Sequence, residues 1–287
     1  MMATVTETPR ARGLAARLRA TATGRSSGFL VRWGVLLALG VAWELVATRV
    51  QSPFFPPMTD ILARARDLWL SGDASTAFVA WDRVQVDLVP SFTRLALGWL
   101  LAAVVGMVAG VVIGRARNLA DYVDPVVHFL RAIPPPALIP PFMILLGQGD
   151  TMKVALIAFG VVWPILLNTI DGVRSVDQVQ LDTARIYGID ARRRLTHIVL
   201  PAAMPKIFAG LRISLAIALI LMVLSEMVGS VDGIGFGILQ AQRSFQYVNM
   251  WAGILVLGIA GYAINAGFLR IERRVLAWHR AERGGAR

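Results

Sequence analysis

Cysteine is absent from this 287-residue chain, and histidine and lysine are scarce. Without cysteine the chain can form neither a disulfide nor a thiolate metal site. Its three histidines, His128, His197 and His279, are too scattered to place two metal ligands on one helix. We therefore expect this chain to hold no metal and no cofactor of its own.

Charged residues are also scarce: they make up 16% of the chain, while hydrophobic residues make up 56% and the mean hydropathy is +0.62. A soluble globular domain has about 25% charged and about 45–50% apolar residues. The apolar excess is gathered in blocks of roughly the 20 residues that cross a bilayer core. The sequence therefore predicts an all-α, polytopic membrane protein.

Six apolar blocks predict six transmembrane helices, near residues 29–47, 92–114, 125–147, 152–170, 208–228 and 250–269. The third block is the weakest, because it contains Arg131 and a run of prolines. If it is counted as a span, both chain termini lie on the same side of the membrane.

The distribution of basic residues predicts which side that is. The segments on the side of the termini contain 19 Lys and Arg residues, and the opposite loops contain six. Since cytoplasmic loops are the more basic, both termini and the loop 171–206 are predicted to be cytoplasmic. The chain then comprises a basic N-terminal tail (1–28), a six-span domain (29–270) and a basic C-terminal tail (271–287). The net charge of +11 follows the span ends rather than one folded face, so no nucleic-acid partner is expected.

The predicted cytoplasmic loop contains the stretch DTARIYGIDARRRLTHIVLP, residues 182–201. Helical sequence runs to Tyr187, and Gly188 can adopt the left-handed conformation that ends helices at low steric cost. Asp190 can cap a second helix over ARRRLTHIV, and Pro201 is expected to stop it. The loop is therefore predicted to fold as a helix, a sharp glycine turn and a second helix.

This stretch resembles the cytoplasmic "EAA" loop of the permease subunits of bacterial ATP-binding-cassette (ABC) importers. That loop reads Glu-Ala-Ala, three residues, Gly, nine residues, Ile, one residue and Leu-Pro. The matching positions of this chain, at the same spacing, are Asp182, Thr183, Ala184, Gly188, Ile198, Leu200 and Pro201. It departs from the pattern at Asp182, where the family has Glu, and at Thr183, where it has Ala.

Three further segments look like parts of the same family. Residues 131–147 are similar to its proline-rich third span, 164–173 to the end of its fourth, and 225–238 to the glycine-rich exit of its fifth. The likeness covers about residues 29–270. Six spans with a long first outer loop look most like the branch that imports alkanesulfonates, taurine, nitrate or pyrimidine precursors of thiamine.

The resemblance implies a non-catalytic transport subunit, embedded in the lipid of the bacterial inner membrane, that forms the path for a small anionic solute such as a sulfonate, taurine or nitrate. It implies three protein partners: a separate ATPase that holds ATP and Mg, an extracytoplasmic binding protein, and a second permease copy in a homodimer. The lysines support the need for a separate ATPase. Neither Lys153 nor Lys206 belongs to a Gly-Lys-[Ser/Thr] phosphate loop.

The resemblance also implies which residues couple the chain to its ATPase. In the family, the short helix around the motif's glycine seats in a groove of the ATPase. Carried over to this sequence, the contact residues are Asp182, Thr183, Ala184, Arg185, Tyr187, Gly188 and Ile189. Three further coupling residues, Ile198, Leu200 and Pro201, are expected to pack the loop against the span ends.

Polar groups inside the membrane are costly, so they are candidates for the translocation path. Glu226, beside Ser225, either faces the path or pairs with a neighbouring span. Asn168 either faces the path or satisfies a carbonyl near the kink expected at Pro164.

The third block supplies the other path candidates. Its prolines, Pro134 and Pro135 among them, free backbone carbonyls that lipid cannot satisfy, so this block is expected to line a wet cavity or to be buried in protein. Arg131 precedes them and either faces the path or reaches the headgroups. Arg94, near the start of the second block, is expected to reach the headgroups as well.

Small residues recur at every fourth position of the second block, namely Gly98, Ala102, Gly106, Gly110 and Gly114. Such a row allows a second helix to approach closely. The neighbour is either another helix of the same subunit or a helix of a second copy.

Two other functions stay open from the residues alone. An ion-coupled secondary transporter or channel requires coupling carboxylates near the middle of the membrane, and none is evident. A membrane enzyme requires converging acids, bases or metal ligands, for which Asp124 and His128 give little support.

Overall fold

The computed structural model describes residues 34–72 and 79–278, and within these ranges the chain is helical, with no β-strand. Contacts divide the chain into two units, Met1–Ala63 and Arg64–Arg287. Each unit is considered by itself.

The first unit contains a helix over residues 34–50, joined by a short turn to the beginning of α2 (Met58–Trp69). Glu44 of the first helix accepts hydrogen bonds from the backbone N–H and the hydroxyl of Thr59, at 3.2 and 2.8 Å. The carboxylate thereby satisfies one of the N–H groups that the first turn of a helix leaves free. This contact fixes the turn between the two helices.

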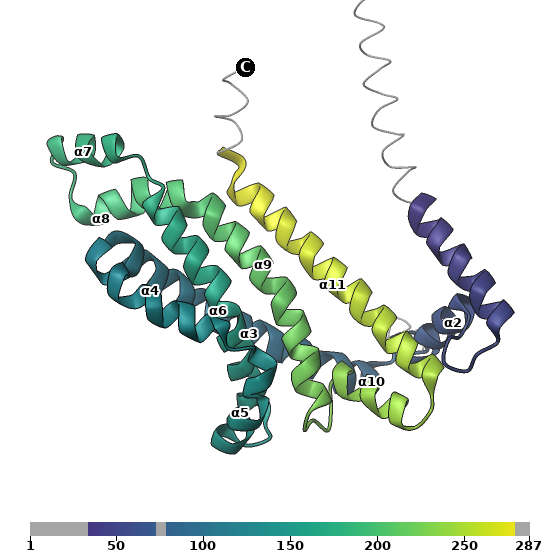
Figure 1. Cartoon of the computed structure of the whole chain (residues 1–287). Coiled ribbons are helices and arrows are strands. Elements are labelled where there is room, and N and C mark those ends of the chain that lie inside the picture. Colours follow the sequence, from purple (N-terminus) through teal and green to yellow (C-terminus); the bar gives the residue numbers. More distant parts are fainter. Residues whose placement is uncertain (1–33, 73–78, 279–287) are drawn as a thin grey trace, which may run out of the picture. The chain divides into compact units, whose positions relative to one another are not determined.

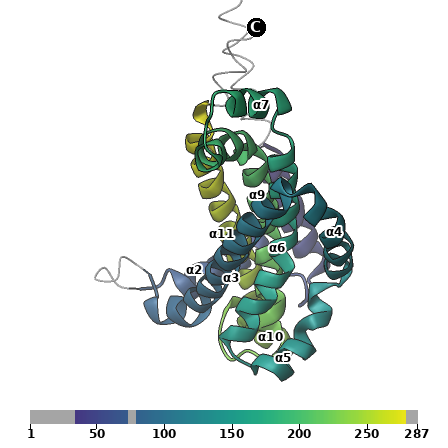
Figure 2. The same ribbon diagram turned by 90° about the vertical axis from the view of Figure 1, so that its left-hand side faces the viewer.

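The second unit contains the remaining helices, which are α3 (Trp81–Arg115), α4 (Arg117–Ala132), the 3-10 turn η2 (Pro135–Leu138), α5 (Ile139–Leu146), α6 (Asp150–Arg174), α7 (Gln178–Ile186), α8 (Ala191–Arg194), the π-helical turn η3 (Leu195–Val199), α9 (Leu200–Met227), α10 (Ile234–Arg243) and α11 (Tyr247–Val275). Helix α6 is central, because it packs on α3 and on α9, and α9 in turn contacts α10 and α11. Both views place α7 at one end of this unit and α5 and α10 at the opposite end (Figure 1, Figure 2), and Figure 1 shows α8 beside α7.

The row of small residues in α3 forms the seam with α6. A Cβ added to Gly98 would lie 2.8 Å from the Cβ of Ile157, and one added to Gly110 would lie 2.6 Å from the Cβ of Thr169. At four glycines of the row, residue i of α3 faces residue i+59 of α6, so the two helices run parallel. The predicted close approach is confirmed, and the neighbour shown here is a helix of the same subunit.

Four helices are long and apolar enough to cross a membrane, namely α3, α6, α11 and the continuous helix Ala191–Met227. The segments Asp121–Ala132 and Pro135–Leu146 qualify only together, as a pair bent by 82°. The predicted third span is thus broken at its proline run, where successive backbone donors are missing. The predicted first span begins outside the described residues, and only its part from residue 34 onward is seen, as helix. The described residues therefore show four candidate spans, or five with the bent pair.

Candidate functional site

The predicted glycine turn closes the end of α7. Helix α7 ends at Ile186, and Gly188 has a φ of +69°. The N–H of Gly188 donates to the carbonyl of Arg185 at 3.0 Å, and the N–H of Ile189 donates to the carbonyl of Ala184 at 2.9 Å. These two bonds form the Schellman arrangement, in which a left-handed glycine satisfies the last carbonyls of a helix. The left-handed conformation expected of Gly188 is confirmed.

The second helix of the stretch begins where the sequence predicts but does not end there. The carboxylate of Asp190 accepts a hydrogen bond from the N–H of Arg193 at 3.3 Å and so caps α8. The prediction that Pro201 stops this helix is wrong, because α8, η3 and α9 form one continuous helix, with Pro201 in the first turn of α9. The π-helical turn η3 ends at Val199, two residues before the proline. Its wider hydrogen-bond pattern allows the chain to continue where an α-helix would lose a bond.

Most of the predicted coupling residues gather in one groove of about 620 Å³ between α7 and the beginning of α9. Asp182 and Arg185 do not line it but form an ion pair with each other at 2.7 Å. Gly188 and Leu200 lie outside the groove as well, and Leu200 is half-buried. The six coupling residues that do line it are Thr183, Ala184, Tyr187, Ile189, Ile198 and Pro201.

The end of α7 exposes large apolar side chains. Ile186 is 85% exposed and Tyr187 is 79% exposed, whereas Ala184 is buried. The surrounding stretch is rich in charged residues, so these side chains do not belong to a lipid-facing band. Exposed apolar groups rimmed by polar residues are typical of a protein–protein contact.

The predicted path residues of the third block lie at the break between α4 and η2. Arg131 and Pro134 are exposed, and Pro135 is half-buried. A Cβ added to Gly160 of α6 would lie 3.2 Å from the side chain of Pro135, so this proline packs closely on α6. The proline run is therefore buried on one side only.

Two other path candidates use their polar groups within their own helices. Asn168 donates to the carbonyl of Pro164 at 2.8 Å, so the alternative of satisfying a carbonyl near this proline is the one the structure shows. Ser225 is buried and donates to the carbonyl of Met222 at 2.8 Å. Neither contact brings these residues together with the proline run.

Glu226, the last path candidate, is one of two buried members of a cluster of charges, in which the side chains of Asp150 and Asp232 are 69% and 35% exposed. The guanidinium of Arg94 donates to Glu226 at 2.8 Å, to Asp150 at 2.7 Å and also to Asp232. One cation of α3 thus joins carboxylates from α9, from the start of α6 and from the loop before α10. Arg94 is 3% exposed and Glu226 is fully buried. The pairing alternative for Glu226 is therefore the one the structure shows.

The stretch GIGFG, residues 233–237, packs around the same carboxylate. Glu226 accepts hydrogen bonds from the hydroxyl of Ser91 at 2.9 Å and from the N–H of Gly235 at 3.0 Å. A Cβ added to Gly233, whose φ is +95°, would lie 2.5 Å from the carboxyl carbon of Glu226. Gly233 and Gly235 thus allow the backbone to approach the buried carboxylate, which explains two of the three glycines of the stretch.

The sequence interpretation of Arg94 is wrong, and with it the cluster was missed. Helix α3 begins at Trp81, so Arg94 lies several turns inside the helix rather than at a span end. Hydropathy locates an apolar stretch but not the start of the helix that contains it. One feature of the sequence does point to the pair: Arg94 and Glu226 have opposite charges and lie in two apolar blocks that contain few other charged residues.

The described residues offer no metal-binding arrangement. Within residues 34–72 and 79–278, no three acidic or histidine side chains are grouped so as to hold a metal ion. The three carboxylates that approach one another are held by the guanidinium of Arg94 instead.

Residues 102–277 match the family described as "Binding-protein-dependent transport system inner membrane component". This range begins within α3 and includes the whole coupling stretch and Glu226. Arg94 lies just before it.

Two relatives are similar along most of their length. SsuC of Bacillus subtilis, named as an aliphatic sulfonates transport permease protein, is 31% identical over 88% of this chain and 85% of its own. TauC of Escherichia coli, a taurine transport system permease protein, is 30% identical over 86% of this chain and 88% of its own. A chain of the MetNI methionine ABC transporter in an inward-facing conformation has a TM-score of 0.60 and 19% identity, covering 68% of this chain and 97% of that chain. That last likeness shows a shared fold.

Proposed function

The chain belongs to the family of binding-protein-dependent transport system inner membrane components and is a non-catalytic permease subunit of an ABC importer, and we propose that a separate ATPase drives it through the end of α7. It is a multi-pass membrane protein. This family membership replaces the alternative that the sequence left open, an ion-coupled secondary transporter or channel.

The observation that carries this proposal is the exposed end of α7, which is closed by the glycine turn. The Schellman turn at Gly188 fixes the helix end, and Ile186 and Tyr187 present apolar surface beside it. Full burial of one large apolar side chain contributes about 1.5–3 kcal/mol. Docking of this end in a groove of the ATPase would bury these side chains. ATP and Mg would be held by the ATPase.

The continuous helix that follows the turn gives a physical route for coupling. It runs over 37 residues from Ala191 to Met227, a length of about 55 Å at 1.5 Å per residue. Its beginning lines the groove beside α7, and its far end carries Glu226 in the charge cluster. A displacement of α7 by the ATPase would therefore move one end of a helix whose other end is tied to α3 and α6.

We further propose six spans, with both termini and α7 in the cytoplasm. The proposed parts are a basic tail over 1–28, a permease domain over 29–270 with the coupling loop 171–206, and a basic tail over 271–287. The 19 basic residues on one side against six on the other support this orientation. The second unit is compatible with this orientation, because the C-terminal ends of α3 and α6 lie near α7, on the side proposed to be cytoplasmic.

The proposed solute is a small sulfonate or a related anion such as nitrate, delivered by an extracytoplasmic binding protein. The names of the two relatives, for aliphatic sulfonates and for taurine, support this class of solute. A second copy of the chain would complete the path, with Arg131 and Pro134 facing it from the exposed side of the proline run. Lipid would cover the exposed apolar side chains of α3 and α11, such as Val104 and Ile259.

The test is reconstitution of the chain in vesicles with the ATPase and the binding protein of its own system. We expect ATP-dependent accumulation of a sulfonate that requires all three proteins. Uptake driven by an ion gradient in vesicles that contain this chain alone would contradict the proposal and favour a secondary transporter.

A further inference from the structure

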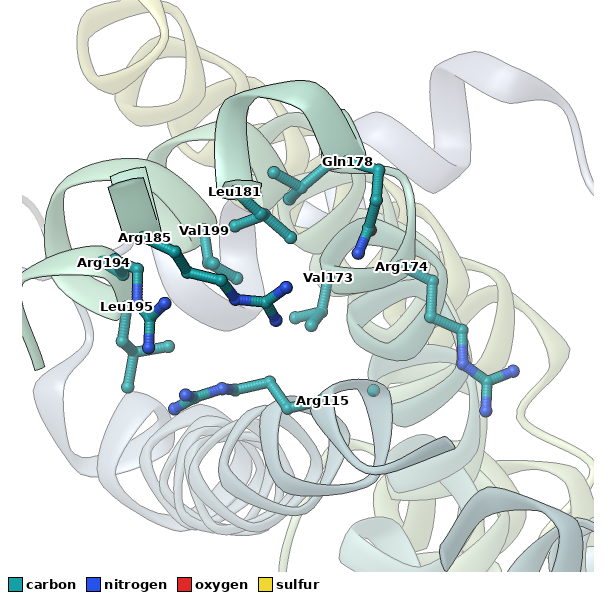
Figure 3. A pocket seen from close by; sticks show the side chains of 11 residues that line it. Arg115, Val173, Arg174, Gln178, Leu181, Arg185, Arg194, Leu195 and Val199 are labelled. Carbon is teal, nitrogen blue, oxygen red and sulfur yellow. The ribbon is translucent and has the colours of Figure 1, made fainter. Parts of the chain in front are cut away.

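A cavity of about 490 Å³ lies between the last residues of α3 and α6 and the helices α7 and α8. Four arginines line it, Arg115, Arg174, Arg185 and Arg194, and the described residues contribute no acidic side chain to its wall. Figure 3 shows the guanidinium groups of Arg115, Arg185 and Arg194 turned toward the same space, whereas that of Arg174 points away. The cavity is therefore a pocket of concentrated positive charge.

Helix ends explain only part of this arrangement. Arg115 and Arg174 are the last residues of α3 and α6, and Arg185 lies in the last turn of α7. The helix dipole favours a cation at such a position by about 0.3–1 kcal/mol. That preference sets where along a helix an arginine occurs. It does not explain why side chains from three separate helices converge on one cavity against their mutual repulsion.

Protein carboxylates neutralise little of this charge. Arg185 pairs with Asp182 at 2.7 Å, and both side chains are more than half exposed. Arg115, Arg174 and Arg194 form no ion pair with another residue of the described ranges 34–72 and 79–278. The described residues therefore leave most of this positive charge without a carboxylate partner, so the cavity is open to an anion from outside them.

We propose that this cavity binds a phosphate group. The planar guanidinium donates pairs of parallel hydrogen bonds that match phosphate oxygens. The cavity lies where the long apolar helices α3 and α6 end, and the ends of helices that cross a bilayer are expected at the depth of the lipid headgroups. Basic pockets between membrane helices bind anionic headgroups. Apolar walls from Leu181, Leu195 and Val199 suit the first carbons of the acyl chains of such a lipid. A soluble phosphate compound has the same recognised group and would contact the same arginines.

The bound phosphate would link parts of the chain that move in coupling. Arg115 belongs to the membrane helix α3, whereas Arg185 and Arg194 belong to α7 and α8 on either side of Gly188. An anion held by all three ties the coupling helix to α3. This site is independent of whether the proposed transport function is correct, because its test measures binding to the chain itself.

The test uses the full chain, purified in a neutral detergent, and follows its Tm as three probes are titrated: phosphatidylglycerol, phosphatidylcholine and inorganic phosphate. A single-site ligand at 100 times its Kd should raise the Tm by about 5 °C or more. The double variant Arg115→Gln/Arg194→Gln should weaken binding at least about tenfold, since it removes two charged donors. The matched control is Arg193→Gln, which removes one charge of the same helix from a side chain that is 80% exposed and outside the cavity.

A saturable shift that the double variant loses and the control keeps supports the site. If phosphatidylglycerol alone gives the shift, the source is a lipid headgroup; if inorganic phosphate also gives it, the site accepts soluble phosphate. The absence of a shift with both phosphatidylglycerol and inorganic phosphate contradicts the proposal. So does an equal loss in Arg193→Gln, which would indicate unspecific charge attraction. A double variant that keeps the shift would also overturn the proposal. If that variant in addition no longer co-purifies with the ATPase, the cavity receives an acidic segment of the partner instead.

Discussion

Replacing Arg94 with Met tests the charge cluster. The arginine side chain is 4% exposed and joins three carboxylates. Methionine has a similar length but offers no donor and no charge. Among the described residues, the substitution leaves the fully buried Glu226 with two hydrogen-bond donors, the hydroxyl of Ser91 and the N–H of Gly235.

Removing one partner of a buried ion pair costs about 3–5 kcal/mol, because the other charge remains desolvated and uncompensated. We expect the free energy of unfolding to fall by about 3 kcal/mol in Arg94→Met, since Glu226 keeps two hydrogen bonds. The double variant Arg94→Met/Glu226→Gln removes the uncompensated charge as well. It should therefore be more stable than Arg94→Met alone, by about 1–2 kcal/mol.

The assay is equilibrium unfolding of the purified chain in mixed micelles, followed by tryptophan fluorescence. Arg83→Met is the matched control on the same helix, because Arg83 is 60% exposed and lies 4.0 Å from Asp87. Exposed pairs contribute about 0–1 kcal/mol, so this control should change little. Two results would contradict this account of the cluster. One is that Arg94→Met is no less stable than Arg83→Met. The other is that the double variant is destabilised by the sum of the effects of Arg94→Met and Glu226→Gln measured singly.

Three further outcomes are expected. In this cysteine-free chain, Pro136→Cys should react readily with a small maleimide, whereas Ile139→Cys, at a position only 6% exposed, should react slowly; equal rates would contradict the described proline run. Gly110→Ala should destabilise the chain by about 1–3 kcal/mol, because its Cβ would lie 2.6 Å from the Cβ of Thr169, and Gly258→Ala, with no atom within 4 Å, should not. The purified chain alone should hydrolyse no ATP, and activity above that of a mock preparation would show a nucleotide site that the sequence does not contain.

Local signals in the sequence predicted several features correctly. A glycine between two helical stretches predicted the left-handed turn at Gly188, because few other residues tolerate that conformation. An aspartate before ARRR predicted the cap at Asp190. The four-residue spacing of small residues predicted a helix seam, although it could not tell which helix would pack there. Each of these features is determined by a few residues that are close together in the sequence, so it can be predicted without knowledge of the fold.

Features that depend on distant residues could not be predicted in the same way. Arg94 and Glu226 are separated by more than 130 positions, and no local pattern indicates that the two side chains meet. Pro201 was expected to end a helix because its ring and missing donor disfavour the interior of one. The π-helical turn that precedes it, at Leu195–Val199, is not indicated by any local pattern of the sequence. The arginine cavity likewise arises from helix ends that only the fold brings together.

The coupling role of the turn at Gly188 is tested by Gly188→Val in the reconstituted importer. A Cβ at this position meets no atom of the chain within 4 Å, so the cost inside the permease is the left-handed conformation alone, about 1–2 kcal/mol. The variant should stay folded and inserted, but the added side chain would separate the turn from the ATPase groove. We expect the co-purifying ATPase and ATP-driven uptake to fall at least about tenfold, while Gly258→Val keeps both. Full retention of the ATPase and normal uptake in Gly188→Val would contradict the assignment of α7 and its glycine turn as the coupling element.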